Sequence, residues 1–157
     1  MYDAEWKAKN RGYFEIGIYN GKTPANLGTL WRSAFQLGAS GIFLIGHRFY
    51  KQASDTVKAW KHVPLREYYD FNHFLSCRPY DCILVGVEMG GKPLAKFHHP
   101  ERAIYLLGAE DNGIPQRIMD ECNCVISLEA VRTESYNVAV AGSLIMYHRQ
   151  FQGGFIV

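Results

Sequence analysis

The feature that most constrains the fold is a regular alternation of short apolar runs with segments of helical periodicity. Apolar runs of this length predict buried β-strands, and apolar residues that recur every three to four positions predict amphipathic helices. Strands alternating with helices are typical of an α/β fold, with a mostly parallel sheet and helices on both faces. The predicted strands cover 13–19, 41–45, 65–68, 81–87, 103–107 and 124–128, and the predicted helices cover 27–37, 51–61, 70–76, 114–121 and 137–150.

Length and composition indicate one folded domain without a strong overall charge. A chain of 157 residues has the size of a single domain, so we assign 1–157 to one domain with 1–12 as a polar lead-in. An apolar fraction of 48% and a charged fraction of 20% are typical of folded rather than disordered chains. The net charge of +2 excludes a strongly basic nucleic-acid coat but leaves room for a local basic surface.

The sequence lacks the usual features of a secreted, membrane or metal-binding chain. Residues 1–12 are polar and mixed in charge, unlike a signal peptide, and the longest near-apolar stretch, 138–147, is too short to span a bilayer. The cysteines form a C-x4-C and a C-x-C pair, which differ from the C-x2-C pairs common in zinc sites. We therefore expect a cytoplasmic protein with reduced thiols, no membrane association and no metal.

The first candidate site lies at the start of the predicted helix 27–37. Asn26 is a good N-cap residue. Gly28 is unusual, because glycine inside a helix costs about 1 kcal/mol relative to alanine. Gly28 and Arg32 are four residues apart and share a helix face off the apolar stripe. A small residue and a cation near a helix N-terminus suit an anionic ligand such as a phosphate. A capped helix with a solvated arginine is the plain alternative.

The second candidate site follows the predicted strand 103–107. This strand runs into Gly108, Glu110 and Gly113. Glycines there let a ligand approach the backbone or allow a positive φ, and ligands of parallel sheets bind beyond the carboxyl ends of strands. An ordinary strand–turn–helix is the alternative. Neither the G-x-G-x-x-G fingerprint nor the P-loop pattern occurs in the sequence.

The third candidate site precedes the last predicted helix. A loop after the strand 124–128 leads to Ser135 and Asn137, either of which can cap the helix 137–150. That helix is apolar nearly all round as far as Met146, so we expect it to be buried, with a subunit interface as one possible location. A capped core helix is the plain alternative.

In this order and spacing, the three segments resemble motifs 1, 2 and 3 of the SpoU/TrmH family of RNA ribose 2′-O-methyltransferases. The family patterns are N-x-G-x-x-x-R, G-x-E-x-x-G-hydrophobic and S-(L/M)-N-hydrophobic, and the resemblance spans roughly 13–150. The chain is similar to the shortest members, which methylate the wobble ribose of tRNA. It departs from the family where Ile126-Ser127-Leu128 replaces Ile-Pro-Met and where Tyr136 replaces Leu or Met.

The resemblance implies a deep trefoil knot at the carboxyl end of the domain, a homodimer, and S-adenosylmethionine held in a bent form by the knot loops. The residues that it implies for cofactor binding are Val87, Leu107, Gly108, Gly113, Ile126, Leu128, Ser135 and Asn137. The residues that it implies for catalysis or its support are Arg32, Asn26, Glu110, Ser135 and Asn137.

The implied reaction passes a methyl group from a sulfonium to a ribose 2′-hydroxyl, with tRNA as the expected substrate and rRNA as the alternative. Because arginine normally stays protonated, we expect Arg32 to position the ribose or a phosphate and to stabilise the developing alkoxide. A catalytically silent RNA-binding module on the same fold and a nucleotide-binding oxidoreductase are the rival hypotheses.

RNA binding needs local basic and aromatic side chains. The candidates are Lys7, Lys9, Arg11, Lys22, His47, Arg48 and Lys51 for charge, and Tyr50, Tyr68 and Tyr69 for base stacking. Two dipeptides are interpreted as turns: Gly90-Gly91, after Val87, and His98-His99, because adjacent histidines rarely face one ion.

Overall fold

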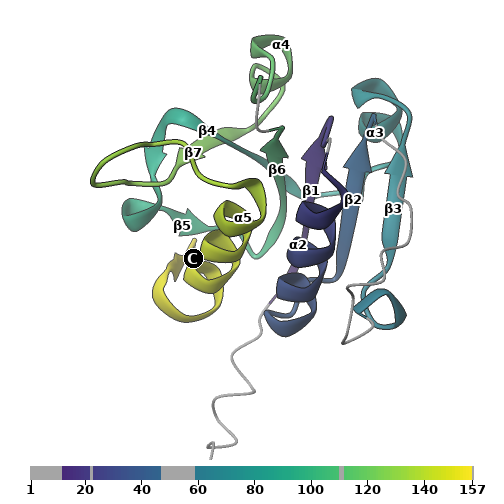
Figure 1. The fold of residues 1–157 in the computed structure, drawn as a ribbon, viewed down its shortest axis with the longest axis horizontal. Coiled ribbons are helices and arrows are strands. Elements are labelled where there is room, and N and C mark those ends of the chain that lie inside the picture. The colour runs from purple at the N-terminus through teal and green to yellow at the C-terminus, as the bar shows by residue number, and fades with distance from the viewer. Residues whose placement is uncertain (1–11, 22, 47–58, 110–111, 157) are drawn as a thin grey trace, which may run out of the picture.

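The computed structural model describes residues 12–21, 23–46, 59–109 and 112–156. The main strands are β1 (Tyr13–Tyr19), β2 (Gly41–Ile45), β3 (Leu65–Tyr68), β4 (Ile83–Pro93), β6 (Arg102–Gly108) and β7 (Cys124–Ser127). They form one sheet in the order β3-β2-β1-β6-β4-β7, and every neighbouring pair is parallel. Their carboxyl ends therefore share one edge of the sheet, which is uppermost in Figure 1.

Helices cover both faces of this sheet, which confirms the α/β expectation. The helices α2 (Pro24–Gln36) and α5 (Val138–Tyr147) pack side by side on one face, and α3 (Phe71–Cys77) and α4 (Gln116–Met119) contribute to the buried cluster on the other (Figure 1). A π-helical turn, η3 (His148–Gln152), continues α5, and the 3-10 turns are η1 (Ala59–Lys61) and η2 (Leu94–Lys96). The trefoil knot stays a prediction of the resemblance.

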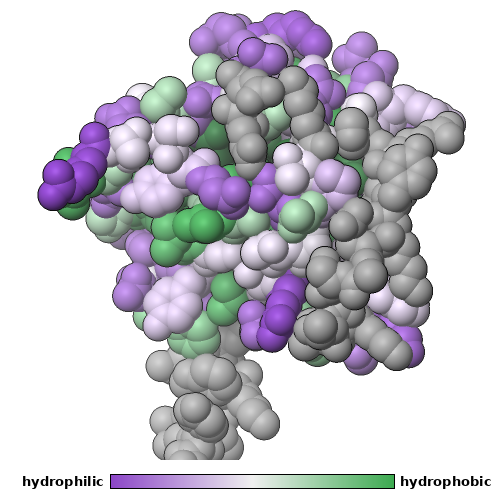
Figure 2. Space-filling model, in the orientation of Figure 1, coloured by the Kyte–Doolittle hydropathy of each residue, from purple (hydrophilic) through white to green (hydrophobic). Residues whose placement is uncertain are grey.

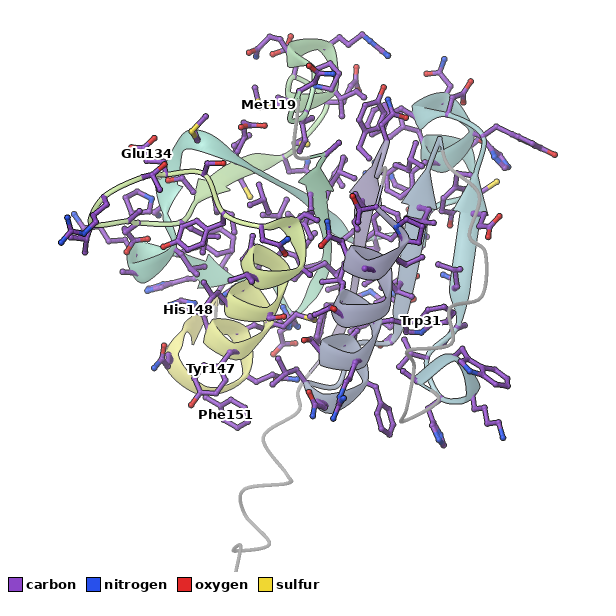
Figure 3. The ribbon with its side chains drawn as sticks, viewed as in Figure 1. Trp31, Met119, Glu134, Tyr147, His148 and Phe151 are labelled. Atoms are coloured by element: carbon purple, nitrogen blue, oxygen red, sulfur yellow. The ribbon has the colours of Figure 1, made fainter. Side chains whose placement is uncertain are left out.

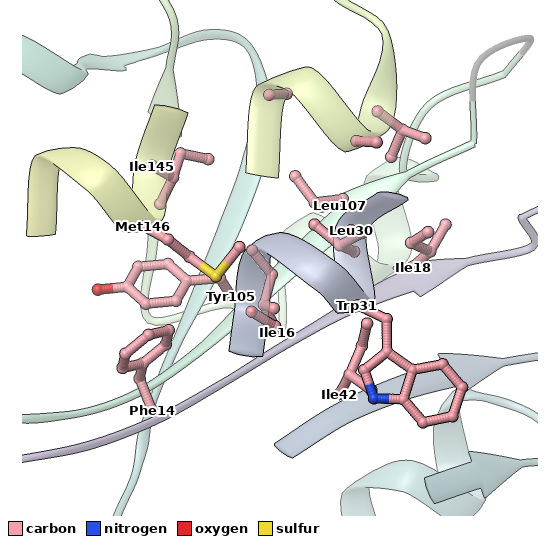
Figure 4. Close-up of a cluster of buried hydrophobic side chains, with 14 of the residues drawn as sticks. Phe14, Ile16, Ile18, Leu30, Trp31, Ile42, Tyr105, Leu107, Ile145 and Met146 are labelled. Carbon is pink, nitrogen blue, oxygen red and sulfur yellow. The ribbon is translucent and has the colours of Figure 1, made fainter. Parts of the chain in front are cut away.

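Each face of the sheet carries its own apolar core. On the α2/α5 face, alternate residues of β1 such as Ile16 pack with Leu30 of α2 and Ile145 of α5, all of them fully buried. Figure 4 shows these side chains meeting over β1 and β6. On the other face, the rings of Phe43 and Phe74 stack at 5.1 Å between centroids. Burial on both faces explains why the strands read as nearly continuous apolar runs.

The first helix begins earlier than the sequence predicts. Its N-cap position is Thr23, and Pro24 occupies the first turn, where a fixed φ and a missing N–H are tolerated. Asn26 therefore lies inside the first turn, and its interpretation as the N-cap is wrong. The helix α3 has a side-chain N-cap, because the Asp70 side chain accepts a hydrogen bond from the His73 N–H at 2.8 Å.

Two predicted turns are wrong. The strand β4 continues through Gly90 and Gly91 to Pro93, and its register against β7 shifts between Val87 and Lys92, which both pair with Ile126. The segment 88–91 is therefore a bulge, and Gly90 allows it by adopting a φ of +86°. His98–His99 forms β5, which pairs in parallel with β8 (Gly154–Phe155). Of the predicted helix 51–61, the described part is the 3-10 turn Ala59–Lys61, and the rest lies outside the described residues.

A buried polar chain links β5 and β6 to η3. The guanidinium of Arg149, fully buried, donates to the Tyr105 hydroxyl at 3.1 Å and to the Pro100 carbonyl at 2.6 Å. Tyr105 lies 2.7 Å from Nδ1 of His99, and His99 Nε2 lies 2.8 Å from Nδ1 of His148. With both histidines neutral, the Tyr105 hydroxyl donates to His99 and His99 donates to His148, so each proton along the chain has an acceptor.

The buried hydrogen bonds that link Tyr105, His99 and His148 predict that the folded protein loses stability in acid. Burial, with the nearby His148, Arg149 and His98, lowers the pKa of His99 to about 3, and burial also lowers the pKa of His148. Because both folded-state pKa values lie below the unfolded value of about 6.5, the unfolded state binds more protons. Stability is therefore complete above about pH 6.5 and is lost as the pH falls, by up to about 1.4 kcal/mol per pH unit for each group. Urea unfolding at several pH values measures this.

The variant His99→Gln should flatten this acid dependence, whereas His98→Gln, at the exposed neighbouring position, should retain it. An acid slope in His99→Gln as steep as in the wild type contradicts the assignment.

Among the residues that the structure describes, no helix is long and apolar enough to cross a membrane.

Candidate ligand and substrate site

A cavity of about 710 Å³ opens at the carboxyl edge of the sheet. Its walls are the β4 bulge, the segment after β6, the loop that joins β7 to α5, and the first turns of α4 and α5. In Figure 3, Met119 by α4 and Glu134 on the long loop mark two of these walls. A volume in this range is typical of sites for small organic ligands.

Glycines bring backbone segments together at the floor of the cavity. A Cβ on Gly108 would lie 2.5 Å from the carbonyl carbon of Gly113 and 2.7 Å from the Ile114 nitrogen. Gly113 has a φ of +61°, and a Cβ there would collide with the Glu88 carboxylate. Gly113 therefore needs glycine for its left-handed backbone, as the sequence predicted. Gly108 needs glycine because the backbone of residues 113–114 lies against it, whereas the sequence predicted the approach of a ligand there.

Glu88 holds the same floor from the β4 side. Its Oε2 accepts a hydrogen bond from the Ile114 N–H at 2.9 Å, and its Oε1 accepts one from the Met89 N–H at 3.1 Å. This carboxylate lines the cavity and fixes the start of α4 relative to the bulge. The motifs do not include Glu88, although its place directly after Val87, at a strand's carboxyl end, marks it as a candidate site residue.

The loop between β7 and α5 is closed by side chain–backbone hydrogen bonds. The Tyr136 hydroxyl donates to the Glu129 carbonyl at 2.6 Å, and Ser127 Oγ donates to the Gly91 carbonyl at 2.8 Å. Tyr136, which departs from the family pattern, thus ties the two ends of the loop together. Ser135 is exposed on this loop and its N–H donates to Thr133 Oγ1 at 3.4 Å.

The structure brings most of the predicted cofactor residues together. The predicted residues that line the cavity are Val87, Leu107, Gly108, Gly113, Leu128 and Ser135. Two others do not line it: Ile126 is buried in the core on the α2/α5 face, and Asn137 caps α5. The cavity also has acidic walls that the sequence did not indicate, from Glu88, Glu129 and Glu134.

Asn137 connects the cavity to the first candidate segment. Its Oδ1 accepts hydrogen bonds from the N–H groups of Ala139 and Val140, at 2.9 and 3.2 Å, and caps α5. Its Nδ2 donates to Oδ1 of Asn26 at 3.0 Å. Because Val138 and Ala141 of the capped helix line the cavity, this amide joins the cavity wall to the first turn of α2. Its two roles leave one orientation of the Asn137 amide.

The first candidate segment presents an open helix face. A Cβ on Gly28 would meet nothing within 4 Å, and Arg32, one turn further on, is exposed. Packing therefore gives no reason for a glycine at position 28. Glu110, the remaining predicted catalytic residue, lies outside the described residues.

Of the residues predicted to contact RNA, one is buried, one is exposed and the others lie outside the described residues. Tyr68 is a wrong prediction, because it is buried against Phe43 and Phe74 in the second core. Tyr69, its neighbour, is 83% exposed. Lys7, Lys9, Arg11, Lys22, His47, Arg48, Tyr50 and Lys51 lie outside the described residues.

The cysteines are free thiols, at positions 77, 82, 122 and 124. Burial raises the pKa of Cys122 to about 11 and also raises those of Cys82 and Cys124, so all three stay protonated at neutral pH. Within the described ranges, no group of three or more His, Cys, Asp or Glu side chains is placed to hold a metal ion.

The sheet is parallel, a cavity lies at its carboxyl edge, and a hydrogen bond links that cavity to the polar face of α2. These features define a ligand-binding α/β protein. The sequence matches the SpoU rRNA Methylase family over residues 14–147, and the chain belongs to this family.

Similar proteins include a tRNA (guanosine(18)-2′-O)-methyltransferase of Mus musculus, 27% identical over 133 residues that cover 79% of this chain and 8% of the mouse protein. The structure of an AdoMet-bound rRNA methyltransferase from Sinorhizobium meliloti superposes with a TM-score of 0.76 at 23% identity, covering 91% of this chain and 58% of that one. A structure described as giving insights into the 2-OH methylation of C/U34 on tRNA has the same TM-score and identity, covering 88% and 94%. The chain spans at most 66% of the length of the curated relatives that it matches in sequence.

Two glycine substitutions should have opposite effects on stability. Gly108→Ala places a methyl group against backbone atoms that cannot move cheaply, so we expect a loss of about 1–3 kcal/mol. Gly28→Ala meets open space inside a helix, so we expect no loss and a gain of up to about 1 kcal/mol. Chemical denaturation measures both. Equal destabilisation by the two substitutions would contradict the packing described here.

Proposed function

We propose that this protein transfers a methyl group from S-adenosylmethionine to a ribose 2′-hydroxyl of RNA, with tRNA as the first substrate to test and rRNA as the alternative. The observation that carries the proposal is the hydrogen bond from Asn137 to Asn26. It joins a cavity suited to a small cofactor to an open helix face with an exposed arginine suited to RNA. Family membership supports RNA as the substrate and methylation as the reaction, and the mouse relative supports the 2′-hydroxyl.

The residues present fit S-adenosylmethionine. The cavity has apolar walls at Leu107, Leu128 and Val138 for an adenine ring, and Gly108 and Gly113 line it with backbone atoms. Its carboxylates at Glu88, Glu129 and Glu134 complement the positive sulfonium and ammonium groups of this cofactor. When bound, the cofactor supplies a methyl group carried on a sulfonium, and the demethylated sulfur is left as a neutral thioether.

The chain itself contributes alignment and electrostatics. Arg32 holds the ribose or an adjacent phosphate through its planar donors. It stabilises negative charge on the 2′-oxygen as the hydroxyl loses its proton to water or to an RNA phosphate. Gly28 lets the RNA backbone approach α2, because no side chain occupies that face one turn before Arg32. Asn137 and Asn26 are positioning residues that keep this face in register with the cavity.

We also propose that the protein acts as a homodimer through α5. Val140, Leu144 and Tyr147 follow one another at helical spacing and are 46%, 42% and 48% exposed. Figure 2 shows hydrophobic surface over α5, and in Figure 3 Tyr147 and Phe151 lie at its lower end. The sequence predicts burial for this helix, and a second copy would bury the stripe. Sedimentation velocity distinguishes the dimer from a monomer.

Arg32 variants test the proposed chemistry. Wild type should transfer labelled methyl groups from S-adenosylmethionine to bulk tRNA or rRNA. Arg32→Lys keeps the charge but loses the planar fork, so we expect kcat to fall by about 10²-fold or more. Arg102→Lys, at the opposite edge of the sheet, should keep wild-type turnover. Near-wild-type turnover in Arg32→Lys would overturn the role of bidentate contact. Cofactor binding without transfer to any RNA would favour the silent RNA-binding module.

Asn137 variants separate helix capping from positioning. Asn137→Asp keeps an oxygen that caps α5 but loses the donor to Asn26. Asn137→Ala loses both, so we expect it to destabilise the fold by about 1 kcal/mol. Asn137→Asp should retain stability and lose methyl transfer to a similar degree as Asn137→Ala. Paired thermal unfolding and label-transfer assays measure this, and full activity in Asn137→Asp would show that donation from Asn137 to Asn26 is not required.

A further inference from the structure

We propose that the stacked pair Tyr69 and His73 is a platform on which an unpaired base of the RNA substrate stacks. This inference deepens the proposed function, because it rests on RNA being the substrate and assigns a contact outside the three motifs. It commits to single-stranded RNA, whose bases are free to stack on an aromatic side chain.

The pair combines exposure with a fixed geometry. The rings of Tyr69 and His73 stack with centroids 5.1 Å apart and an angle of 27° between their planes. Tyr69 is nevertheless 83% exposed, so one face of its ring is covered by the imidazole while most of the side chain contacts solvent. An aromatic ring that is held in place yet open to solvent loses little conformational entropy when a base stacks on it.

Two contacts hold the imidazole, and a third fixes the His73 backbone. The Tyr69 N–H donates to His73 Nδ1 at 3.0 Å, so Nδ1 is the unprotonated nitrogen and Nε2 carries the proton. The edge of the buried Tyr68 ring packs against His73 at 5.4 Å between centroids. The His73 backbone N–H is fixed by the N-cap Asp70. The platform is therefore anchored in the second core rather than carried by a loose side chain.

The platform lies at the same sheet edge as the methyl-transfer site. Backbone hydrogen bonds of 2.9 Å run from Asn20 N–H to the Ile45 carbonyl and from Gly46 N–H to the Tyr68 carbonyl. These bonds tie together the carboxyl ends of β1, β2 and β3. The chain then enters α2, with Asn26 in its first turn, shortly after Asn20. Figure 1 shows α3 and the ends of these strands along the upper edge.

Tyrosine substitutions with direct RNA binding test the inference. The probes are a fluorescein-labelled, mixed-sequence single-stranded RNA of about 20 nucleotides and unmodified tRNA, followed by fluorescence anisotropy. Loss of one base-stacking contact should raise Kd by at least about fivefold in Tyr69→Ala. Tyr69→Phe keeps the ring and should bind within about twofold of wild type. Tyr80→Ala is the matched control, because Tyr80 is 91% exposed but precedes β4 at the amino edge of the sheet.

Equal binding by wild type and Tyr69→Ala overturns the platform, as does equal weakening in Tyr80→Ala. Weakening in Tyr69→Phe comparable to that in Tyr69→Ala also overturns it, since the hydroxyl and not the ring would be the contact. Where methylation is measured, Tyr69→Ala should raise KM for RNA and leave kcat and S-adenosylmethionine affinity near wild type.

The failures of the two proposals are distinguishable. Methyl transfer by wild type together with unchanged RNA binding in Tyr69→Ala rejects the platform alone. RNA binding that depends on Tyr69, without methyl transfer to any RNA, rejects the proposed function alone. Absence of RNA binding by wild type rejects the platform whatever the chemistry.

Discussion

The parallel direction of all six strands is the constraint on which the rest of the molecule depends. It brings every strand-to-helix connection of the sheet to one edge, so segments far apart in sequence meet there. The cavity, the Asn26–Asn137 hydrogen bond and the Tyr69–His73 pair all lie along that edge. Antiparallel pairing at any central strand would separate them.

The Asn137 amide serves both halves of the proposed site. Its oxygen is committed to the N-terminus of α5 and its nitrogen to Asn26. A helix-capping interaction thereby also determines how α2 is oriented beside the cavity. Positioning by an amide that is already fixed needs no reorganisation when substrate binds.

The strands were predictable because burial on both faces leaves an unbroken apolar run. The strands at 13–19, 41–45 and 65–68 have the predicted bounds. The wrong predictions fall where contacts between residues far apart in the sequence determine the secondary structure. Gly90 and Gly91 look like a turn locally, but pairing of Lys92 with Ile126 keeps the strand going. His98 and His99 look like a turn, but pairing with a segment more than fifty residues later makes them a strand.

In the site, six cavity residues could be predicted from the motifs, whereas the hydrogen bonds of individual side chains could not be predicted from the sequence. Nothing in the sequence shows that Glu88 binds the Ile114 N–H or that Tyr136 binds the Glu129 carbonyl. The exposure of neighbouring side chains could not be predicted either, because Tyr68, the last residue of β3, is buried, whereas Tyr69 directly follows the strand and is exposed.

The bulge in β4 has a consequence for how this fold can diversify. Val87 and Lys92 both pair with Ile126, so the strand leaves and rejoins β7 at a single partner residue. A change in the length of the 88–91 segment would therefore shift no other pair in the sheet. Its residues Glu88, Met89 and Gly90 form one wall of the cavity. Insertions in this segment would therefore change the cavity wall, and with it the selectivity for ligands, while the β4–β7 pairs on either side keep their register.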